Sequence, residues 1–265
     1  MPPIVTLTTD FEEHDPFVAS TKGVVCTHCP GVQIIDLSHG ISRQSVREGA
    51  LFIAGAVPFF PEGTIHLVAV NSGARPIAVS LSRQFIICPD NGVLTLLAEQ
   101  HEIAEARAIT NPKLNLAQGG QTYFARDIFA PAAAMLACGG SLSDMGDRVD
   151  KITQLDLPRP KKENRLVSGC IIHVNRFGSL LTNIHKSFLA GSAVTEVRVG
   201  GFPVGPLSAS YSQVKVGFPL ALFGSSGYLE IAYNGDRADK RLGADVDMLV
   251  TVGIEPEGPG ERLRT

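Results

Sequence analysis

The pattern of apolar residues changes near residue 157 of this 265-residue chain, and that change constrains the fold more than any other feature. In the first part, segments typical of strands alternate with segments typical of helices. Strands are predicted at residues 4–9, 32–37, 64–70, 77–81 and 85–88, and helices at residues 17–26, 45–56, 92–98 and 127–137. Alternation at this spacing predicts a parallel-rich sheet covered by helices.

The second part of the chain has a different character. Residues 158–166 are proline-bearing, charged and without periodicity, which is typical of an interdomain linker, and no helix is expected beyond them. Strands divided by Gly, Pro and Ser turns are predicted at residues 169–174, 180–184, 194–199, 220–223, 228–233 and 247–252. We therefore expect an N-terminal α/β domain at 1–157, a linker at 158–166 and a small all-β, barrel-like or sandwich domain at 167–265.

Composition argues against several kinds of partner. A net charge of −3 with scattered basic residues predicts no binding surface for nucleic acid or anionic membrane. The longest apolar stretches, residues 51–60 and 65–70, are too short to cross a bilayer. The N-terminal residues lack the basic and apolar regions of a secretory signal, so the expected location is the cytoplasm.

The five cysteines form an odd, scattered set, which suits a reducing compartment. Cys26 and Cys29 have the C-x-x-C spacing of a zinc half-site or a redox motif. No second Cys or His pair with ligand spacing follows them, so incidental thiols at a helix end are the favoured interpretation. Neither a metal nor a cofactor is expected.

Asp10 ends the first predicted strand. Open α/β sheets use a carboxylate at the carboxyl end of a strand to bind sugar or nucleotide hydroxyls. An aspartate at this position is equally consistent with capping of the next helix. In the second part, the turn at 224–227 contains Ser225 and Ser226, whose amides and hydroxyls could hold a carboxylate. The pattern around Tyr211 is more typical of a core aromatic.

A series of short motifs resembles the S-adenosyl-L-methionine (SAM) hydroxide adenosyltransferases, or SAM hydrolases, whose relatives include the fluorinase and the chlorinase. The matching segments are residues 9–11 with 15–18, 22–24, 35–39, 46–50, 60–64, 89–92, 126–134, 177–178 with 181–184, and 224–232. They follow the order of the family almost end to end. The chain is thus identified as a divergent member of this family.

The resemblance implies a homotrimer that holds SAM or adenosine between the N-terminal domain of one subunit and the C-terminal domain of the next. It implies attack of water at the ribose C5′ carbon with methionine as leaving group, which yields adenosine and methionine. Because the sulfonium makes methionine a good leaving group, no acid is needed there.

The resemblance also assigns substrate-binding residues. Asp10 matches the aspartate that binds the ribose, Tyr211 falls near an aromatic that packs on the ligand, and Ser225 and Ser226 match the turn that receives the methionine carboxylate. Three more candidates lie in the family's Asp-Arg-Phe-Gly-Asn stretch. Here Asn175 replaces the Asp, Phe177 is retained, and Ser179 replaces an Asn that contacts adenine.

The catalytic positions depart from the family pattern. In the hydrolases an Asp, an Arg and a His organise the attacking water. Here Asn71 stands at the Asp position, Phe124 replaces the His, and Arg75 is the candidate arginine in a shortened loop whose register is open. Neither Asn71 nor Phe124 can accept a proton, so weak activity is expected. The region does not match the halogenases either, which have Tyr-Pro in place of Asn71 and Ser72.

Three interpretations follow. The first is a SAM hydrolase, or a drifted enzyme with another nucleophile or a related substrate. The second is a catalytically impaired family member that binds SAM or adenosine without turnover. The third is an α/β protein whose pocket serves an unrelated small molecule, since fold alone does not determine function.

Overall fold

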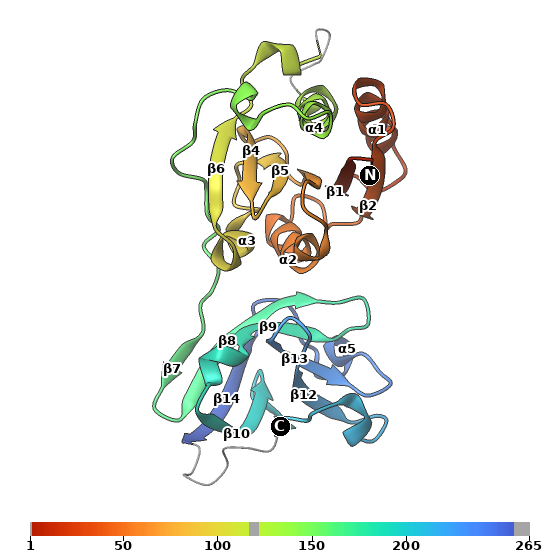
Figure 1. Cartoon of the computed structure of the whole chain (residues 1–265). Coiled ribbons are helices and arrows are strands. Elements are labelled where there is room, and N and C mark those ends of the chain that lie inside the picture. The colour runs from red at the N-terminus through yellow and green to blue at the C-terminus, as the bar shows by residue number, and fades with distance from the viewer. Residues whose placement is uncertain (1, 117–121, 257–265) are drawn as a thin grey trace. The chain divides into compact units, whose positions relative to one another are not determined.

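The computed structural model describes residues 2–116 and 122–256, and the chain divides into two units, Met1–Asp156 and Leu157–Thr265 (Figure 1). Unit 1 carries a six-stranded sheet with the order β2-β1-β3-β5-β4-β6. Its strands are β1 (Ile4–Thr9), β2 (Gln33–Ser38), β3 (Ile65–Ala69), β4 (Pro76–Leu81), β5 (Gln84–Pro89) and β6 (Ile103–Ala108). Its α-helices are α1 (Phe17–His28), α2 (Val46–Ala56), α3 (Thr95–Gln100) and α4 (Ala130–Ala137).

The helices of unit 1 cover both faces of this sheet. One core cluster joins α1 and α4 to residues such as Val5 and Leu7 of β1, and a second joins α2 and α3 to residues such as Val68 and Val79. Figure 1 shows α1 with α4 on one side and α2 with α3 on the other. Ser45 begins α2 by accepting a hydrogen bond from the amide of Glu48, the Ser-x-x-Glu pattern of a helix start. The predicted α/β class is confirmed, as three layers.

The sheet is mixed, which refines the parallel-rich prediction. β1 pairs in parallel with β2 and β3, and β3 with β5, whereas β4 is antiparallel to both β5 and β6. Two residues, Ser82 and Arg83, join β4 to β5, and both have positive φ. A two-residue turn with that backbone makes a tight hairpin. The edge strand β6 was not predicted, because its alanines and charged residues have weak strand propensity.

This topology gathers several chain segments at one edge of the sheet. The carboxyl ends of the parallel strands β1, β3 and β5 lead into Asp10, Val70 and Asp90, respectively. The antiparallel strand β4 starts at the same edge, just after Arg75. Side chains far apart in sequence therefore converge where α/β sheets bind ligands.

A π-helical turn, Ala125–Phe129, precedes α4 directly. The sequence predicted a single helix over residues 127–137, and the structure starts it earlier and with wider turns. Single π-helical turns are rare and are often found at functional sites. Short 3₁₀ turns complete the unit at Val57–Phe59, Pro112–Leu114 and Leu142–Asp144.

Unit 2 is an eight-stranded antiparallel sheet with the order β11-β10-β14-β8-β9-β13-β12, with β7 paired to β8. Its strands are β7 (Lys161–Glu163), β8 (Leu166–Val174), β9 (Leu180–His185), β10 (Ser192–Val199), β11 (Phe202–Gly205), β12 (Pro219–Phe223), β13 (Tyr228–Tyr233) and β14 (Leu249–Pro256). A bridge between Leu207 and Ala221 brings the two ends of this sheet together. The barrel-like all-β prediction is confirmed.

One expectation about unit 2 was wrong. A helix, α5 (Ala238–Leu242), lies between β13 and β14, and 3₁₀ turns occur at Lys186–Leu189 and Tyr211–Gln213. The five-residue helix ends at Gly243, whose φ of +56° suits the left-handed position that stops a helix. So short a segment has too few turns to produce a helical period, which is why it was not predicted.

Candidate active site

Asp10 is held by main-chain amides. Its Oδ2 accepts hydrogen bonds from the amides of Gln44, at 2.9 Å, and Asn71, at 3.1 Å. Gln44 and Asn71 both have positive φ, a backbone conformation that aims their N–H groups at the strand end and is uncommon for residues other than glycine. The helix α1 begins after Pro16 without a side-chain cap, so the capping alternative for Asp10 was wrong.

A second set of bonds fixes Asn71 and links it to Arg75. The side-chain amide of Asn91 donates to the carbonyls of Val70, at 3.0 Å, and Asn71, at 3.1 Å. The neighbouring Asp90 pairs with the guanidinium of Arg75 through Oδ2 and accepts from the amide of Thr153 through Oδ1 at 2.7 Å. Asn71 and Arg75 thus belong to one network at the edge that carries Asp10, and Arg75 is engaged with a carboxylate.

Asp10 lines a hollow of about 390 Å³. The other lining residues are Phe11, Glu12, Asp15, Phe17, Arg43 and Gln44. Two aromatic rings, three carboxylates and one guanidinium therefore face the same space. Such a mixture can bind a ligand that carries hydroxyls, a flat apolar part and a positive charge.

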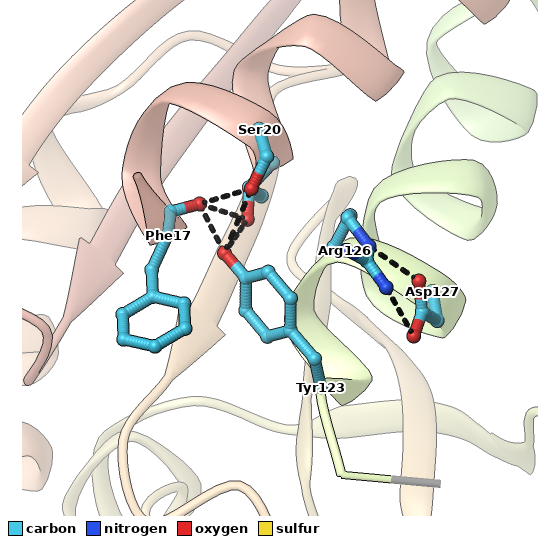
Figure 2. Close-up of polar contacts among 6 residues, drawn as sticks. Phe17, Ser20, Tyr123, Arg126 and Asp127 are labelled. Atoms are coloured by element: carbon cyan, nitrogen blue, oxygen red, sulfur yellow. Dashed lines mark hydrogen bonds and ion pairs between the residues drawn. The ribbon is translucent and has the colours of Figure 1, made fainter. Parts of the chain in front are cut away.

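Three rings pack together beside this hollow. Phe11, Phe17 and Tyr123 have ring-centroid separations of 5.1 to 5.9 Å in tilted and edge-to-face arrangements. Figure 2 shows the Tyr123 hydroxyl pointing at the first turn of α1, where it donates to the carbonyl of Phe17. Thr21 Oγ1 lies 2.8 Å from the same hydroxyl. Tyr123 therefore ties the start of α1, and with it Phe17, to the π-helical turn.

Arg126 and Asp127 support Tyr123 from the other side. Arg126 donates two hydrogen bonds to the buried carboxylate of Asp127, Nε to Oδ1 at 2.6 Å and Nη2 to Oδ2 at 3.0 Å. Its guanidinium lies over the Tyr123 ring, 5.0 Å from the centroid (Figure 2). Burial raises the pKa of Tyr123, while hydrogen bonds with Ser20 and Thr21 oppose the change. The hydroxyl therefore keeps its proton and can donate.

Phe124 lies between these groups in sequence but differs from them in its contacts. It is half-buried and packs against the core cluster under α1 and α4, as Phe11 and Tyr123 also do. A phenyl ring there supplies an apolar surface and no proton-transfer chemistry.

In unit 2, a tight loop places Asn175, Phe177 and Ser179. The side-chain oxygen of Asn175 accepts from the amides of Phe177 and Ser179, both at 3.0 Å. Gly178 has φ of +83°, and a Cβ there would lie 2.6 Å from Asp239, so the loop requires glycine. This conformation leaves the Phe177 side chain 81% exposed and buries Ser179.

These residues border a hollow of about 640 Å³ that Tyr211 also lines. The Tyr211 hydroxyl donates to Oε1 of Glu230 at 2.8 Å. Burial is the main cause that raises the pKa of Tyr211; the Glu230 carboxylate adds to it and Ser179 opposes it. Tyr211 is thus a lining residue with a fixed hydroxyl rather than a core aromatic.

Ser225 and Ser226 lie in the exposed turn between β12 and β13. Neither is among the residues that line the hollow of unit 2. The turn is nevertheless close to it, because a Cβ at Gly224 would lie 3.1 Å from Oε2 of Glu230. Glu230 therefore stands between Tyr211 and the serine turn.

Sequence reasoning missed several residues that line or support these two hollows. Gln44 and Asn91 act on Asp10 and Asn71 through hydrogen bonds across many residues of sequence, which no local pattern reveals. Glu230 gave a usable signal, since a carboxylate at a half-buried position of an alternating strand needs a polar partner. Tyr123 gave none. Within residues 2–116 and 122–256, no group of three His, Cys, Asp or Glu side chains is placed to hold a metal ion.

Comparison with known proteins adds to this description. The family model for the SAM hydroxide adenosyltransferase N-terminal domain matches residues 5–146, and that for the C-terminal domain matches residues 169–251. The chain is 34% identical to an (R)-S-adenosyl-L-methionine hydrolase of Thermus thermophilus, over 91% of this chain and 96% of that protein. It is 29% identical to a fluorinase of Actinoplanes, over 88% and 91% of the two chains.

Solved structures agree with these matches. The crystal structure of a conserved protein from Thermotoga maritima superposes with a TM-score of 0.86 at 32% identity, over 94% of this chain and 99% of that one. A conserved protein from Thermus thermophilus gives a TM-score of 0.77 at 32% identity, over 95% and 100% of the two chains. The likeness therefore extends through both units.

Proposed function

The chain belongs to the SAM hydroxide adenosyltransferase family, and we propose that it converts SAM and water to adenosine and methionine by displacement at the ribose C5′ carbon. Relatives that carry the name (R)-S-adenosyl-L-methionine hydrolase, among them one from Salinispora tropica that is 32% identical over 99% of this chain, support the proposal.

The observation that carries it is the fixed carboxylate of Asp10. An ionised carboxylate offers about four acceptor positions, and the amides of Gln44 and Asn71 use only two. The remaining capacity suits two vicinal hydroxyls such as those of a ribose. Because main-chain amides hold the carboxylate in place beforehand, little ordering is needed when the sugar binds.

The hollow of unit 2 supports binding of the rest of the substrate. Phe177 and Tyr211 offer aromatic surface for a purine, and Glu230 and Ser179 offer hydrogen-bond acceptors beside it. Asn175 shapes the loop that presents Phe177. The serine turn at Ser225 and Ser226 supplies hydroxyls and amides of the kind that bind a carboxylate.

The proposed reaction needs a group that orients the attacking water. Asn71 carries a neutral amide at the edge of the sheet, Arg75 is paired with Asp90, and Phe124 is apolar. A positioned general base typically contributes about 10²–10⁴-fold to a rate. We therefore expect slow turnover. The same observation favours a second candidate function, a SAM- or adenosine-binding protein with little or no turnover.

One assay separates these functions. The pure protein is incubated with SAM, and adenosine and methionine are followed by chromatography against a protein-free control. Equimolar products above the background support hydrolysis. Dissociation constants for SAM and adenosine without product would favour the binding protein, and neither turnover nor binding would refute both.

We further propose a homotrimer in which the Asp10 hollow of one subunit and the Phe177–Tyr211 hollow of a neighbour share one substrate. Each hollow alone carries only part of what SAM requires, which supports completion by a second copy. Light scattering should give three times the 28.2 kDa mass of the chain. A monomer at micromolar concentration would contradict this arrangement.

The cytoplasm is the proposed location, supported by five free cysteines in an odd, scattered set. Among the described residues, no helix is long and apolar enough to span a lipid bilayer.

A further inference from the structure

Helices α1 and α4 lie side by side on one face of the sheet (Figure 1). At their first turns, Tyr123 reaches Phe17 and Thr21 of α1 from the π-helical turn that leads into α4. At their last turns, the thiol of Cys138 donates to the carbonyl of His28 at 3.5 Å. Cys138 therefore connects the C-terminal end of α4 to the C-terminal end of α1.

Two cysteines meet at this point. Cys29 and Cys138 are the residues immediately after α1 and α4, and their amides close the last turns by donating to Val25 and Ala134. The Sγ of Cys138 lies 3.5 Å from the carbonyl oxygen of the peptide unit that joins His28 to Cys29. Cys29 is 2% exposed, whereas Cys138 is exposed to solvent. A buried cysteine thus lies next to a cysteine that a soluble reagent can reach.

We propose that Cys29 and Cys138 form a redox-active pair that hydrogen peroxide converts to an intramolecular disulfide joining α1 to α4. The proposal is independent of the function proposed above. It gives a role to Cys29 of the C-x-x-C motif, for which the described residues offer no metal site. Its partner Cys138 lies more than one hundred residues away in sequence.

The order of reaction follows from exposure. The Cys138 sulfur attacks peroxide first; the O–O bond breaks, and a sulfenic acid and one water form. The Cys29 sulfur then attacks the Cys138 sulfur, the S–O bond breaks, and a second water leaves as the S–S bond forms. Two thiols lose two electrons and two protons in total, and one peroxide becomes two waters. A thiol reductant reduces the disulfide and restores both thiols.

Cys29 reacts second. Burial, together with the Cys138 thiol, raises the pKa of Cys29 to about 11, so this thiol is not the first to be oxidised. Its attack on the sulfenic acid is the slower step, because it must lose its proton to become the nucleophile. The bond needs a sulfur–sulfur distance of about 2.05 Å. The Cys138 sulfur starts in contact with the carbonyl of His28, the residue just before Cys29. It would close a loop of about one hundred residues, which stabilises chiefly by restricting the unfolded chain.

Cys26 provides a matched control. It is exposed on α1, three residues before Cys29, and would be the competing partner if exposure alone decided. Cys26 and Cys29 also lie on one tryptic peptide, between Lys22 and Arg43, so the wild-type digest cannot tell them apart. The Cys26→Ser variant removes that ambiguity.

The test uses the whole chain, reduced, desalted and treated with one to ten equivalents of hydrogen peroxide. Remaining thiols are blocked, the protein is digested without reductant, and cross-linked peptides are identified by mass spectrometry. We expect the cross-link in wild type and Cys26→Ser, its loss in Cys29→Ser and Cys138→Ser, and a melting temperature about 5 °C higher for the oxidised wild type.

Three results would overturn the proposal: an equally abundant cross-link in Cys29→Ser through Cys26, a sulfinic acid at Cys138 with the Cys29 thiol unmodified, or cross-links between chains. The wild-type and Cys26→Ser digests decide the matter even if the Cys29→Ser chain folds poorly, because Cys26 is exposed and its replacement leaves the core intact.

Discussion

The two hollows hold their polar groups by different means. In unit 1, main-chain amides from two residues of positive φ fix the Asp10 carboxylate. In unit 2, a side-chain pair, Tyr211 with Glu230, carries the polar function, and Phe177 projects into solvent with 81% of its surface exposed. A main-chain bond costs no rotamer freedom on ligand binding, whereas exposed side chains must be ordered.

This difference suggests a division of labour. Unit 1 offers a preformed charged anchor, so changes there should be severe. Unit 2 offers adaptable aromatic surface, so single changes there should be mild. The predictions below probe that contrast, from the largest expected effect to the smallest.

Asp10→Ala should lower kcat/KM for SAM, and the affinity for adenosine, by about 1,000-fold, because two hydrogen bonds to a charged group each contribute about 1.5–3 kcal/mol. Asp10→Asn keeps an acceptor without the charge and should fall between wild type and Asp10→Ala. Glu13→Ala, an exposed acid of the same segment that does not line the hollow, is the control. If Asp10→Ala binds adenosine normally, the anchor is assigned to the wrong residue.

His66 of unit 1 should make the fold acid-sensitive. Burial lowers its pKa to about 4, with Gln84 opposing the change, and its Nδ1 lies 2.8 Å from Thr6 Oγ1. In the unfolded chain His66 takes up a proton below about pH 6.5, whereas in the folded chain it does so only near pH 4. The contribution of the neutral His66 to the free energy of unfolding is therefore fully present above pH 6.5 and is lost as the pH falls from 6.5 to 4. Over this range the free energy of unfolding should fall by about 3 kcal/mol.

Urea unfolding at pH 7 and pH 4.5 checks this expectation. His66→Asn should abolish most of the pH dependence in this window, while His185→Asn of unit 2, whose ring is bonded to Ser187 near the surface, should leave it intact. If the free energy of unfolding depends on pH equally in wild type and His66→Asn, the acid sensitivity comes from another group.

Asn71→Asp combined with Phe124→His should raise the rate of SAM hydrolysis by at least about 10-fold, because the pair restores groups that can orient and deprotonate a water. In the proposed mechanism both groups act on one water, so the double variant should exceed the product of the two single changes. Ser72→Asp with Phe124→His, which moves the carboxylate by one residue, is the matched control. A wild-type protein as fast as the Thermus thermophilus relative assayed beside it would refute the idea that these positions limit the rate.

Tyr211→Phe should weaken adenosine binding by only about 5-fold, because it removes one hydrogen bond to Glu230 worth about 1 kcal/mol and keeps the ring. Tyr233→Phe, another tyrosine that lines the hollow of unit 2, serves for comparison. Calorimetric titration measures both. A loss for Tyr211→Phe as large as that of Asp10→Ala would end the distinction between a rigid and an adaptable hollow.

Much of the fold could be predicted because its signals are local. Period-two and period-3.6 patterns located β1, α2 and β13 to within one or two residues. Weak strand formers concealed β6, and the five residues of α5 were too few for a helical period. The Ser82–Arg83 hairpin was missed because neither residue is a typical left-handed one.

The sequence by itself determined the two-part organisation, the family and the position of Asp10 at a strand end, because periodicity and motif order are properties of contiguous residues. Only the tertiary structure decided what holds Asp10, that Arg75 pairs with Asp90, that Tyr123 ties α1 to the π-helical turn, and that Cys138 contacts the end of α1 beside Cys29. Each of these depends on hydrogen bonds between segments that strand order and helix packing bring together. Such contacts follow from the burial of a shared core, which no short window of sequence contains.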